Sequence, residues 1–227
     1  MQDIRRHQQE FEHNLFTIID NVMPPEWYDA IAARARALIA AGDATLQKPP
    51  TRAGEERFVQ GPYRFHMLLG GHVRRTFPEI DALYHGWCGW LSLITQWDVI
   101  TSPHKNLTTG EPSDVFYANI KAYEPGDGEL DWHQDRNPLA AILYLNDVLG
   151  GALHVRKDRH DVMTEQRIVP RRGRLALVNG QRLWHAAKPP RDVTRMCMVM
   201  SYFTPDNVAL VNWNERKERS ILNADAV

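Results

Sequence analysis

The feature that most constrains the fold is a succession of short strand-like runs in the second half of the chain. From Val115 onward, turn signals separate eight runs: VFYANIKAY, LDWHQD, LAAILYLN, GALHVRK, RIVP, GRLALVN, RLWHAA and TRMCMVMSYF. The turn signals are Pro125-Gly126, Asn146-Asp147, Gly150-Gly151, Arg172-Gly173 and Asn179-Gly180. Closely spaced strands without intervening helices indicate an antiparallel barrel or sandwich.

The first half of the chain has a different pattern. A strand is predicted for NLFTIID (14–20), and a helix for PPEWYDAIAARARALIAAG (24–42), where Pro25 suits a first turn and Gly42 a C-terminal cap. A second helix is predicted from Pro78, with a core-facing stripe made of Ile80, Leu83, Trp87, Leu91, Ile94 and Trp97. The Gly-, Pro- and charge-rich segments 47–75 and 101–114 are predicted loops, the first with one strand. We therefore expect an N-terminal helical layer packed on a C-terminal β-barrel.

Composition and charge narrow the class of protein. Hydrophobic residues make up 43% of the 227 residues and charged residues 24%, as in ordinary globular proteins. The net charge of −1 lacks the basic excess of a strong nucleic-acid binder, so a nucleic-acid partner is not favoured. Two cysteines, Cys88 and Cys197, are too few for a disulfide framework. The N-terminus has no secretory signal, and the most apolar stretch, 86–97, is too short to span a membrane. We expect a cytoplasmic protein.

The motif His133-Gln134-Asp135 points to a metal site. Side chains two residues apart leave a strand on the same face, so an imidazole and a carboxylate would project together. A third ligand is needed, and the downstream histidines are His154, His160 and His185. His160 lies in a charged turn where exposure is expected, whereas His185 follows the hairpin signal VNGQRLW in a strand that returns towards the core.

Arg195 follows His185 by ten residues and opens the apolar strand that ends the barrel. Both faces of this strand are largely apolar, so the strand and the Arg195 guanidinium are expected to be buried. A buried guanidinium needs an anionic partner. The partner is either an internal carboxylate or a bound dicarboxylate ligand. Two histidines and one carboxylate form the facial triad of non-haem Fe(II) oxygenases, although a zinc hydrolase can use the same ligand types.

The order and spacing of four segments carry a resemblance to a known family. The segments are KAYEPGDGELDWHQD, AILYLND, GGALHV and GRLALVNGQRLWHAAKPPRDVTR, with 49 residues between Asp135 and His185. Together they resemble the Fe(II)- and 2-oxoglutarate-dependent dioxygenase superfamily, in its prolyl-hydroxylase-like branch. The resemblance extends from Phe116 to Phe203, with a fainter likeness in FTIIDNVMPPEWYDAI near the N-terminus.

The resemblance implies an α+β, mainly β fold. This is a double-stranded β-helix, a jelly-roll or cupin-like barrel, with N-terminal helices packed on one sheet. We expect a single domain over residues 1–227, in which 1–113 form supporting helices, strands and loops, 114–205 the catalytic core and 206–227 a tail.

The resemblance also assigns roles to residues of this chain. Iron would be held by His133, Asp135 and His185, and the distal carboxylate of 2-oxoglutarate by Arg195. The cosubstrate pocket would be lined by Tyr123, Tyr144 and Asn119. Many relatives carry Ser or Thr where this chain has Cys197, and Thr194 or Ser201 are the proposed substitutes for that hydroxyl.

The implied reaction uses Fe(II), 2-oxoglutarate and O₂, with ascorbate as a candidate reductant, and releases succinate and CO₂. Because a carboxylate is kept at Asp135, hydroxylation of an unactivated C–H bond is favoured over halogenation; desaturation and ring closure stay open. The favoured substrate is a free amino acid or related metabolite, and the alternative is a peptidyl-prolyl or other protein residue. Candidate substrate contacts are Arg64, His66, Trp132, Arg136, Asn137 and Trp184. A nucleic-acid demethylase, a zinc hydrolase and a non-catalytic carboxylate-binding barrel remain competing interpretations.

Overall fold

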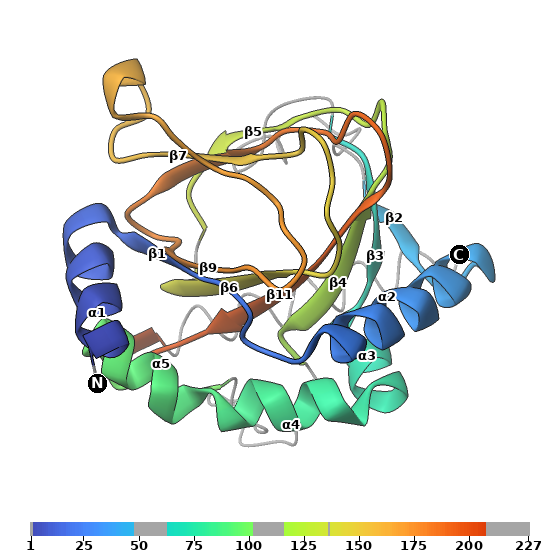
Figure 1. The fold of residues 1–227 in the computed structure, drawn as a ribbon, viewed down its shortest axis with the longest axis horizontal. Coiled ribbons are helices and arrows are strands. Elements are labelled where there is room, and N and C mark those ends of the chain that lie inside the picture. The colour runs from blue at the N-terminus through green and yellow to red at the C-terminus, as the bar shows by residue number, and fades with distance from the viewer. Residues whose placement is uncertain (1, 48–62, 102–115, 136, 208–227) are drawn as a thin grey trace.

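The helices and strands are arranged as two β-sheets that face each other above a layer of helices (Figure 1). The structure, a computed structural model, describes residues 2–47, 63–101, 116–135 and 137–207. The α-helices in these ranges are α1 (Gln2–Asn14), α2 (Pro25–Ala40), α3 (Gly70–Thr76), α4 (Pro78–Gly86) and α5 (Cys88–Thr95). The first strands are β1 (Phe16–Ile19), β2 (Thr45–Gln47), β3 (Phe65–Leu68), β4 (Ala118–Tyr123), β5 (Leu130–His133) and β6 (Leu139–Tyr144). The later strands are β7 (Leu153–Arg156), β8 (Gln166–Ile168), β9 (Leu175–Asn179), β10 (Trp184–Ala187) and β11 (Arg195–Tyr202).

The two sheets form a double-stranded β-helix. The larger sheet has the strand order β1-β9-β6-β11-β4-β3-β2, and the smaller one β5-β10-β7-β8. Neighbouring strands in both sheets are antiparallel. All eight strands expected after Val115 are present, so the predicted mainly β fold is confirmed.

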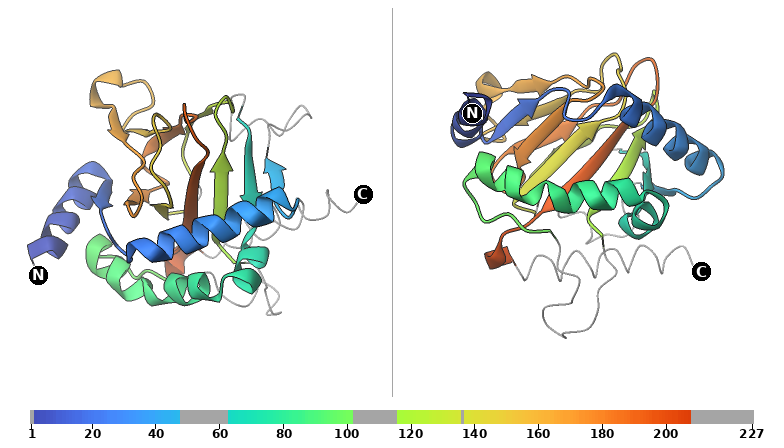
Figure 2. Two further views of the ribbon diagram at one scale, coloured as in Figure 1. Left: turned by 45° about the vertical axis from the view of Figure 1, so that its right-hand side comes forward. Right: turned by 60° about the horizontal axis from the view of Figure 1, so that its bottom comes forward.

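The helices cover the outer face of the larger sheet, as expected of the N-terminal layer (Figure 2). The core between helices and sheet includes Ile31, Leu91 and Met198, all buried. A second core lies between the two sheets and includes Val155 and Leu183. Strand β11 contributes to both cores, because its methionines face the helices while alternate residues face the smaller sheet.

Several predicted boundaries are wrong. The helix predicted from Pro78 is broken at Trp87 into α4 and α5, where the Trp87 N–H bonds to carbonyls both two and four residues back and the weak helix former Gly86 precedes it. Residues 2–14, for which no element was predicted, form α1. Within 47–75 the expected strand is β3, and α3 follows it; 48–62 and 102–115 lie outside the described residues.

Strand β5 ends at His133, so Asp135 lies two residues beyond the strand on which it was predicted. Asp135 is instead held by its backbone N–H, which donates to the Gly180 carbonyl at 2.8 Å. Among the described residues, no helix is long and apolar enough to cross a membrane.

Candidate metal centre

Three predicted ligands converge between the sheets, and we call His133, Asp135 and His185 the triad. His133 closes β5, and the antiparallel register places it directly opposite His185 of β10. The two imidazole ring centroids lie 4.2 Å apart. Asp135 approaches both rings, with Oδ1 3.7 Å from His133 Nε2 and Oδ2 3.5 Å from His185 Nε2. One ligand atom from each residue fits within 4.8 Å of the others, a spacing compatible with one metal ion.

Backbone carbonyls orient both imidazoles. His133 Nδ1 lies 2.7 Å from the Asp131 carbonyl oxygen, and His185 Nδ1 lies 3.1 Å from that of Leu183. A carbonyl accepts and cannot donate, so each Nδ1 carries a proton and each Nε2 is the atom left for a metal. The triad therefore presents two imidazole Nε2 atoms and one carboxylate from preformed positions.

The electrostatics keep the carboxylate ionised and one imidazole neutral. Burial, with a smaller effect of the nearby His185, lowers the pKa of His133 to about 4. Burial alone would raise the pKa of Asp135, but the two histidines outweigh it and lower this pKa well below its usual value. Burial opposes the charged form of His185, yet the Asp135 carboxylate raises its pKa. A divalent cation would replace the proton shared by this pair.

A glycine lets the loop carrying Asp135 pack closely. A Cβ atom on Gly180 would lie 2.6 Å from the Asn137 carbonyl oxygen and 2.7 Å from the Asp135 Cβ. The hairpin signal Asn179-Gly180 thus has a second use beside the turn, because only glycine leaves room for Asp135 at this position.

Arg195 also lines this pocket, and its buried guanidinium has no acidic partner among the described residues. Its side chain is 3% exposed, and Nη1 donates to the carbonyls of Gly151 and, at 3.0 Å, Lys188. The guanidinium carbon lies 4.1 Å from the ring centroid of Tyr123. Its Nε is buried without a hydrogen-bond partner, and no ion pair joins Arg195 to an acid among the described residues. Of the two expected partners, an internal carboxylate is therefore not found, and the orphaned nitrogen fits a bound anion.

Six of the seven predicted site residues line one pocket. Its described lining is Lys121, Tyr123, Leu130, His133, Asp135, Ala140, Ile142, Tyr144, Leu153, His185, Ala187, Arg195, Cys197 and Val199. Asn119 is not among them, although its Oδ1 is buried without a hydrogen-bond partner. Burial raises the pKa of both Tyr123 and Tyr144 well above the usual value, so both phenols stay protonated and can donate.

The two substitutes proposed for a hydroxyl at Cys197 are not available. Thr194 Oγ1 donates to Glu124 at 2.6 Å, and Ser201 Oγ accepts from Asn137 Nδ2 at 2.7 Å. Neither residue lines the pocket. The described pocket lining therefore does not support either residue as the substitute.

Lys121 lines the pocket, although the sequence reasoning gave it no role. Its position on the same strand face as Tyr123 was the available signal, since residues two apart share a face.

The predicted substrate contacts do not line this pocket. This holds for Arg64, His66, Trp132, Asn137 and Trp184, and Arg136 lies outside the described residues. Trp132 instead stacks against Arg156, whose guanidinium carbon lies 4.0 Å from the indole centroid.

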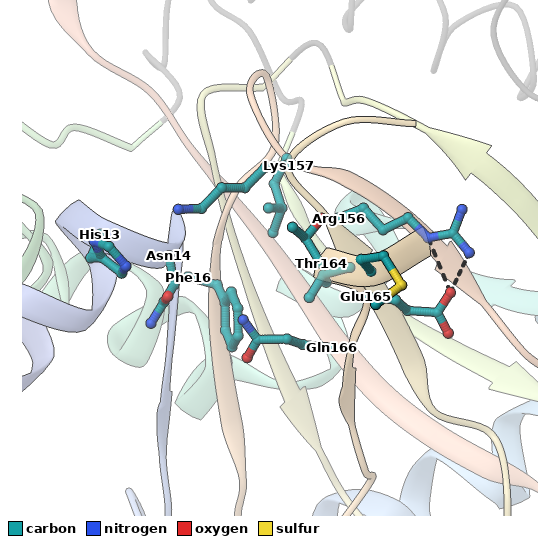
Figure 3. Close-up of a pocket in the computed structure, with 11 residues that line it drawn as sticks. His13, Asn14, Phe16, Arg156, Lys157, Thr164, Glu165 and Gln166 are labelled. Carbon is teal, nitrogen blue, oxygen red and sulfur yellow. Dashed lines mark hydrogen bonds and ion pairs between the residues drawn. The ribbon is translucent and has the colours of Figure 1, made fainter. Parts of the chain in front are cut away.

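A second hollow lies apart from the triad, between the end of α1 and the segment joining β7 to β8 (Figure 3). Its lining is His13, Asn14, Phe16, Val155, Arg156, Lys157, Met163, Thr164, Glu165, Gln166 and Leu183. Glu165 accepts hydrogen bonds from Arg156 and pairs with His154 at 2.8 Å. Glu165 is thus already paired, and among the described residues the hollow holds no cluster of metal-ligand side chains like the triad.

Comparison with solved structures gives the class of fold. A Pseudomonas putida prolyl-4-hydroxylase superposes with a TM-score of 0.60 and 18% identity, over 88% of this chain and 98% of that one. A Trichoplax adhaerens prolyl hydroxylase, in complex with a peptide fragment of the hypoxia inducible factor oxygen degradation domain, gives 0.61 and 17%, over 92% and 94%. The non-haem α-ketoglutarate-dependent epimerase SnoN from nogalamycin biosynthesis gives 0.66 and 12%, over 89% and 81%.

These structures define the fold as that of the 2-oxoglutarate- and Fe(II)-dependent oxygenases, including prolyl hydroxylases. No family model and no curated protein sequence matches the chain. The predicted resemblance is confirmed at the level of the fold.

Proposed function

We propose that this protein is an Fe(II)- and 2-oxoglutarate-dependent dioxygenase that hydroxylates an unactivated C–H bond. The observation that carries the proposal is the triad together with an unpaired buried guanidinium in one pocket. A zinc hydrolase has no need for the second feature, whereas a chelating keto diacid needs a cation at its far end. Residues 114–205 would form the catalytic core of a single domain.

The residues present fit both groups. His133, Asp135 and His185 would hold Fe(II), and Arg195 would hold the distal carboxylate of 2-oxoglutarate. With O₂, the bound iron and 2-oxoglutarate supply oxidative decarboxylation, which gives succinate and CO₂ and drives hydroxylation of the substrate. Ascorbate is a candidate reductant for the iron.

The chain's own groups would bind and orient. The carbonyls of Asp131 and Leu183 fix both imidazoles with Nε2 towards the metal. The protonated phenols of Tyr123 and Tyr144 can donate to a carboxylate in the pocket without repelling it. Apolar neighbours such as Leu153 and Val199 exclude water from the pocket wall.

For the substrate, we propose an amino-acid-type molecule, with a free amino acid or related metabolite ahead of a peptidyl-prolyl residue. Neighbours of similar fold include a prolyl hydroxylase in complex with a peptide and enzymes from nogalamycin biosynthesis, so the fold accommodates both kinds of substrate. The described residues form the barrel and its helical layer, without a separate peptide-docking module.

The test is succinate release by Fe(II)-loaded protein with 2-oxoglutarate against panels of amino acids, metabolites and prolyl peptides. We expect one panel to stimulate succinate release and its product to gain one oxygen atom in mass spectrometry. The Asp135→Ala variant is the control for the metal. Hydrolysis without consumption of 2-oxoglutarate would contradict the proposal and favour a zinc enzyme.

A further inference from the structure

Lys121 occupies a defined place beside the proposed cosubstrate site. It lies on β4 directly opposite Cys197 of β11, and Cys197 lies directly opposite Tyr144 of β6. Side chains that face each other across neighbouring strands are close enough to contact. Lys121, Cys197 and Tyr144 therefore form one row across the pocket wall, and all three line the pocket.

The next row along the same strands contains Arg195. Its register partner on β4 is Tyr123, two residues after Lys121 and on the same face. The Lys121 ammonium lies 5.2 Å from the ring centroid of Phe65, and that ring lies 4.7 Å from Tyr123. The two cations thus belong to adjacent rows and flank one aromatic pair.

The ammonium of Lys121 makes no hydrogen bond or ion pair with a carboxylate among the described residues, and its side chain is half-buried. The anion that its charge acts on in the pocket is Asp135, whose pKa it helps to lower. Arg195 in the next row is also without an acid. Two cations without a paired acid, beside a carboxylate that would bind the metal, favour a ligand with more than one negative charge.

The charge of Lys121 affects both the triad and Cys197. Burial has the largest effect on the pKa of each triad residue, and the Lys121 charge is among the smaller effects that lower all three. Burial also raises the pKa of the Cys197 thiol, against the charges of Arg195 and Lys121. Cys197 is therefore a neutral thiol, which is a weak hydrogen-bond donor.

A carboxylate bound to Arg195 would consequently find a poor donor at position 197. The hydroxyls of Thr194 and Ser201 bond elsewhere and do not line the pocket. The ammonium on the neighbouring strand is a strong donor in the row that contains the thiol.

We propose that Lys121 determines specificity for the cosubstrate: its ammonium binds the carboxylate held by Arg195, in place of a hydroxyl at position 197. The pocket would therefore select a dicarboxylate 2-oxo acid over a monocarboxylate of the same length. This inference rests on the proposed function.

The test is calorimetric titration of anaerobic, Fe(II)-loaded protein with 2-oxoglutarate and with 2-oxovalerate, which lacks the distal carboxylate. In Lys121→Met we expect the Kd for 2-oxoglutarate to rise about tenfold or more, because a charge-assisted hydrogen bond is lost. The Kd for 2-oxovalerate should change less than about twofold. Adding Cys197→Ser to Lys121→Met should restore part of the affinity for 2-oxoglutarate. The control Lys157→Met, in the second hollow, should leave both affinities unchanged.

The outcomes distinguish a failure of the proposed function from a failure of the role inferred for Lys121. If the wild-type protein does not bind 2-oxoglutarate, the proposed function fails and the inference fails with it. If the wild type binds it and Lys121→Met binds it equally well, or loses both oxo acids alike, the inference alone is overturned. Thermal unfolding and near-ultraviolet circular dichroism verify that each variant is folded. If Lys121→Met does not fold, Lys121→Gln replaces it in the same titrations.

Discussion

At the scale of single residues, the site depends on how closely the Asp135 loop packs on the β9–β10 turn. Gly180 accepts the Asp135 backbone N–H, and its missing side chain leaves space for the Asp135 Cβ and the Asn137 carbonyl. The orientation of the carboxylate thus depends on a residue that contributes no ligand atom.

Gly180→Ala should therefore weaken metal binding. The added Cβ would lie 2.6–2.7 Å from its neighbours, so the Asp135 loop must shift. We expect the affinity for Fe(II) or Mn(II) to fall about tenfold, as is typical when a group that orients a metal ligand is changed. We also expect a loss of about 1–3 kcal/mol in the free energy of unfolding. Metal titration and chemical denaturation measure the two effects.

The matched control is Gly89→Ala on α5, where a new Cβ would meet nothing within 4 Å. Alanine is the better helix former, so this variant should be as stable as the wild type or slightly more so, with unchanged metal affinity. Equal metal affinity in Gly180→Ala and the wild type would show that the close packing does not position Asp135.

At the scale of secondary-structure elements, ion pairs stabilise the edge of the smaller sheet at β8. Glu165, just before β8, pairs with His154 and Arg156 of β7, and Figure 3 shows the pair with Arg156. These hydrogen bonds lower the pKa of Glu165 from 4.5 to about 2, and those from Arg156 have the largest effect. A carboxylate with a depressed pKa stabilises the fold above the unfolded-state pKa, and this contribution is lost as the pH falls towards the folded-state pKa.

Glu165→Gln should therefore reduce the free energy of unfolding at pH 7 by about 1 kcal/mol, since a pair near the surface is partly screened by water. The difference between wild type and variant should shrink as the pH falls from 4.5 towards about 2. Urea denaturation over this pH range measures it, with Glu12→Gln on exposed α1 as the control. A stability difference that does not change with pH would contradict the role assigned to Glu165.

At the scale of the whole molecule, the sequence predicts the barrel well because its signals are local. Alternation and turn dipeptides locate all eight strands from β4 to β11, and His133, His185 and Arg195 lie on strands whose inner faces are predictable from a period of two. The helix α1 is not predictable in this way, because it is strongly polar and buries His7 with Phe11 in place of an aliphatic stripe.

What the sequence does not predict depends on register between strands. The neighbourhood of Lys121 and Cys197 arises from the pairing of β4 with β11, which are more than seventy residues apart in the chain. Likewise, the engagement of Thr194 with Glu124 and of Ser201 with Asn137 depends on side chains that meet only in the folded barrel. The packing of Gly180 on Asp135 is non-local for the same reason.

The central claim is that three separated side chains hold one ferrous ion while a buried guanidinium anchors a chelating keto diacid. The most direct measurement is the visible absorption spectrum of the anaerobic protein with Fe(II) and 2-oxoglutarate. We predict a weak metal-to-ligand charge-transfer band in the wild type and its loss in His185→Ala. A wild type without the band, or a His185→Ala variant that keeps it, would contradict the account.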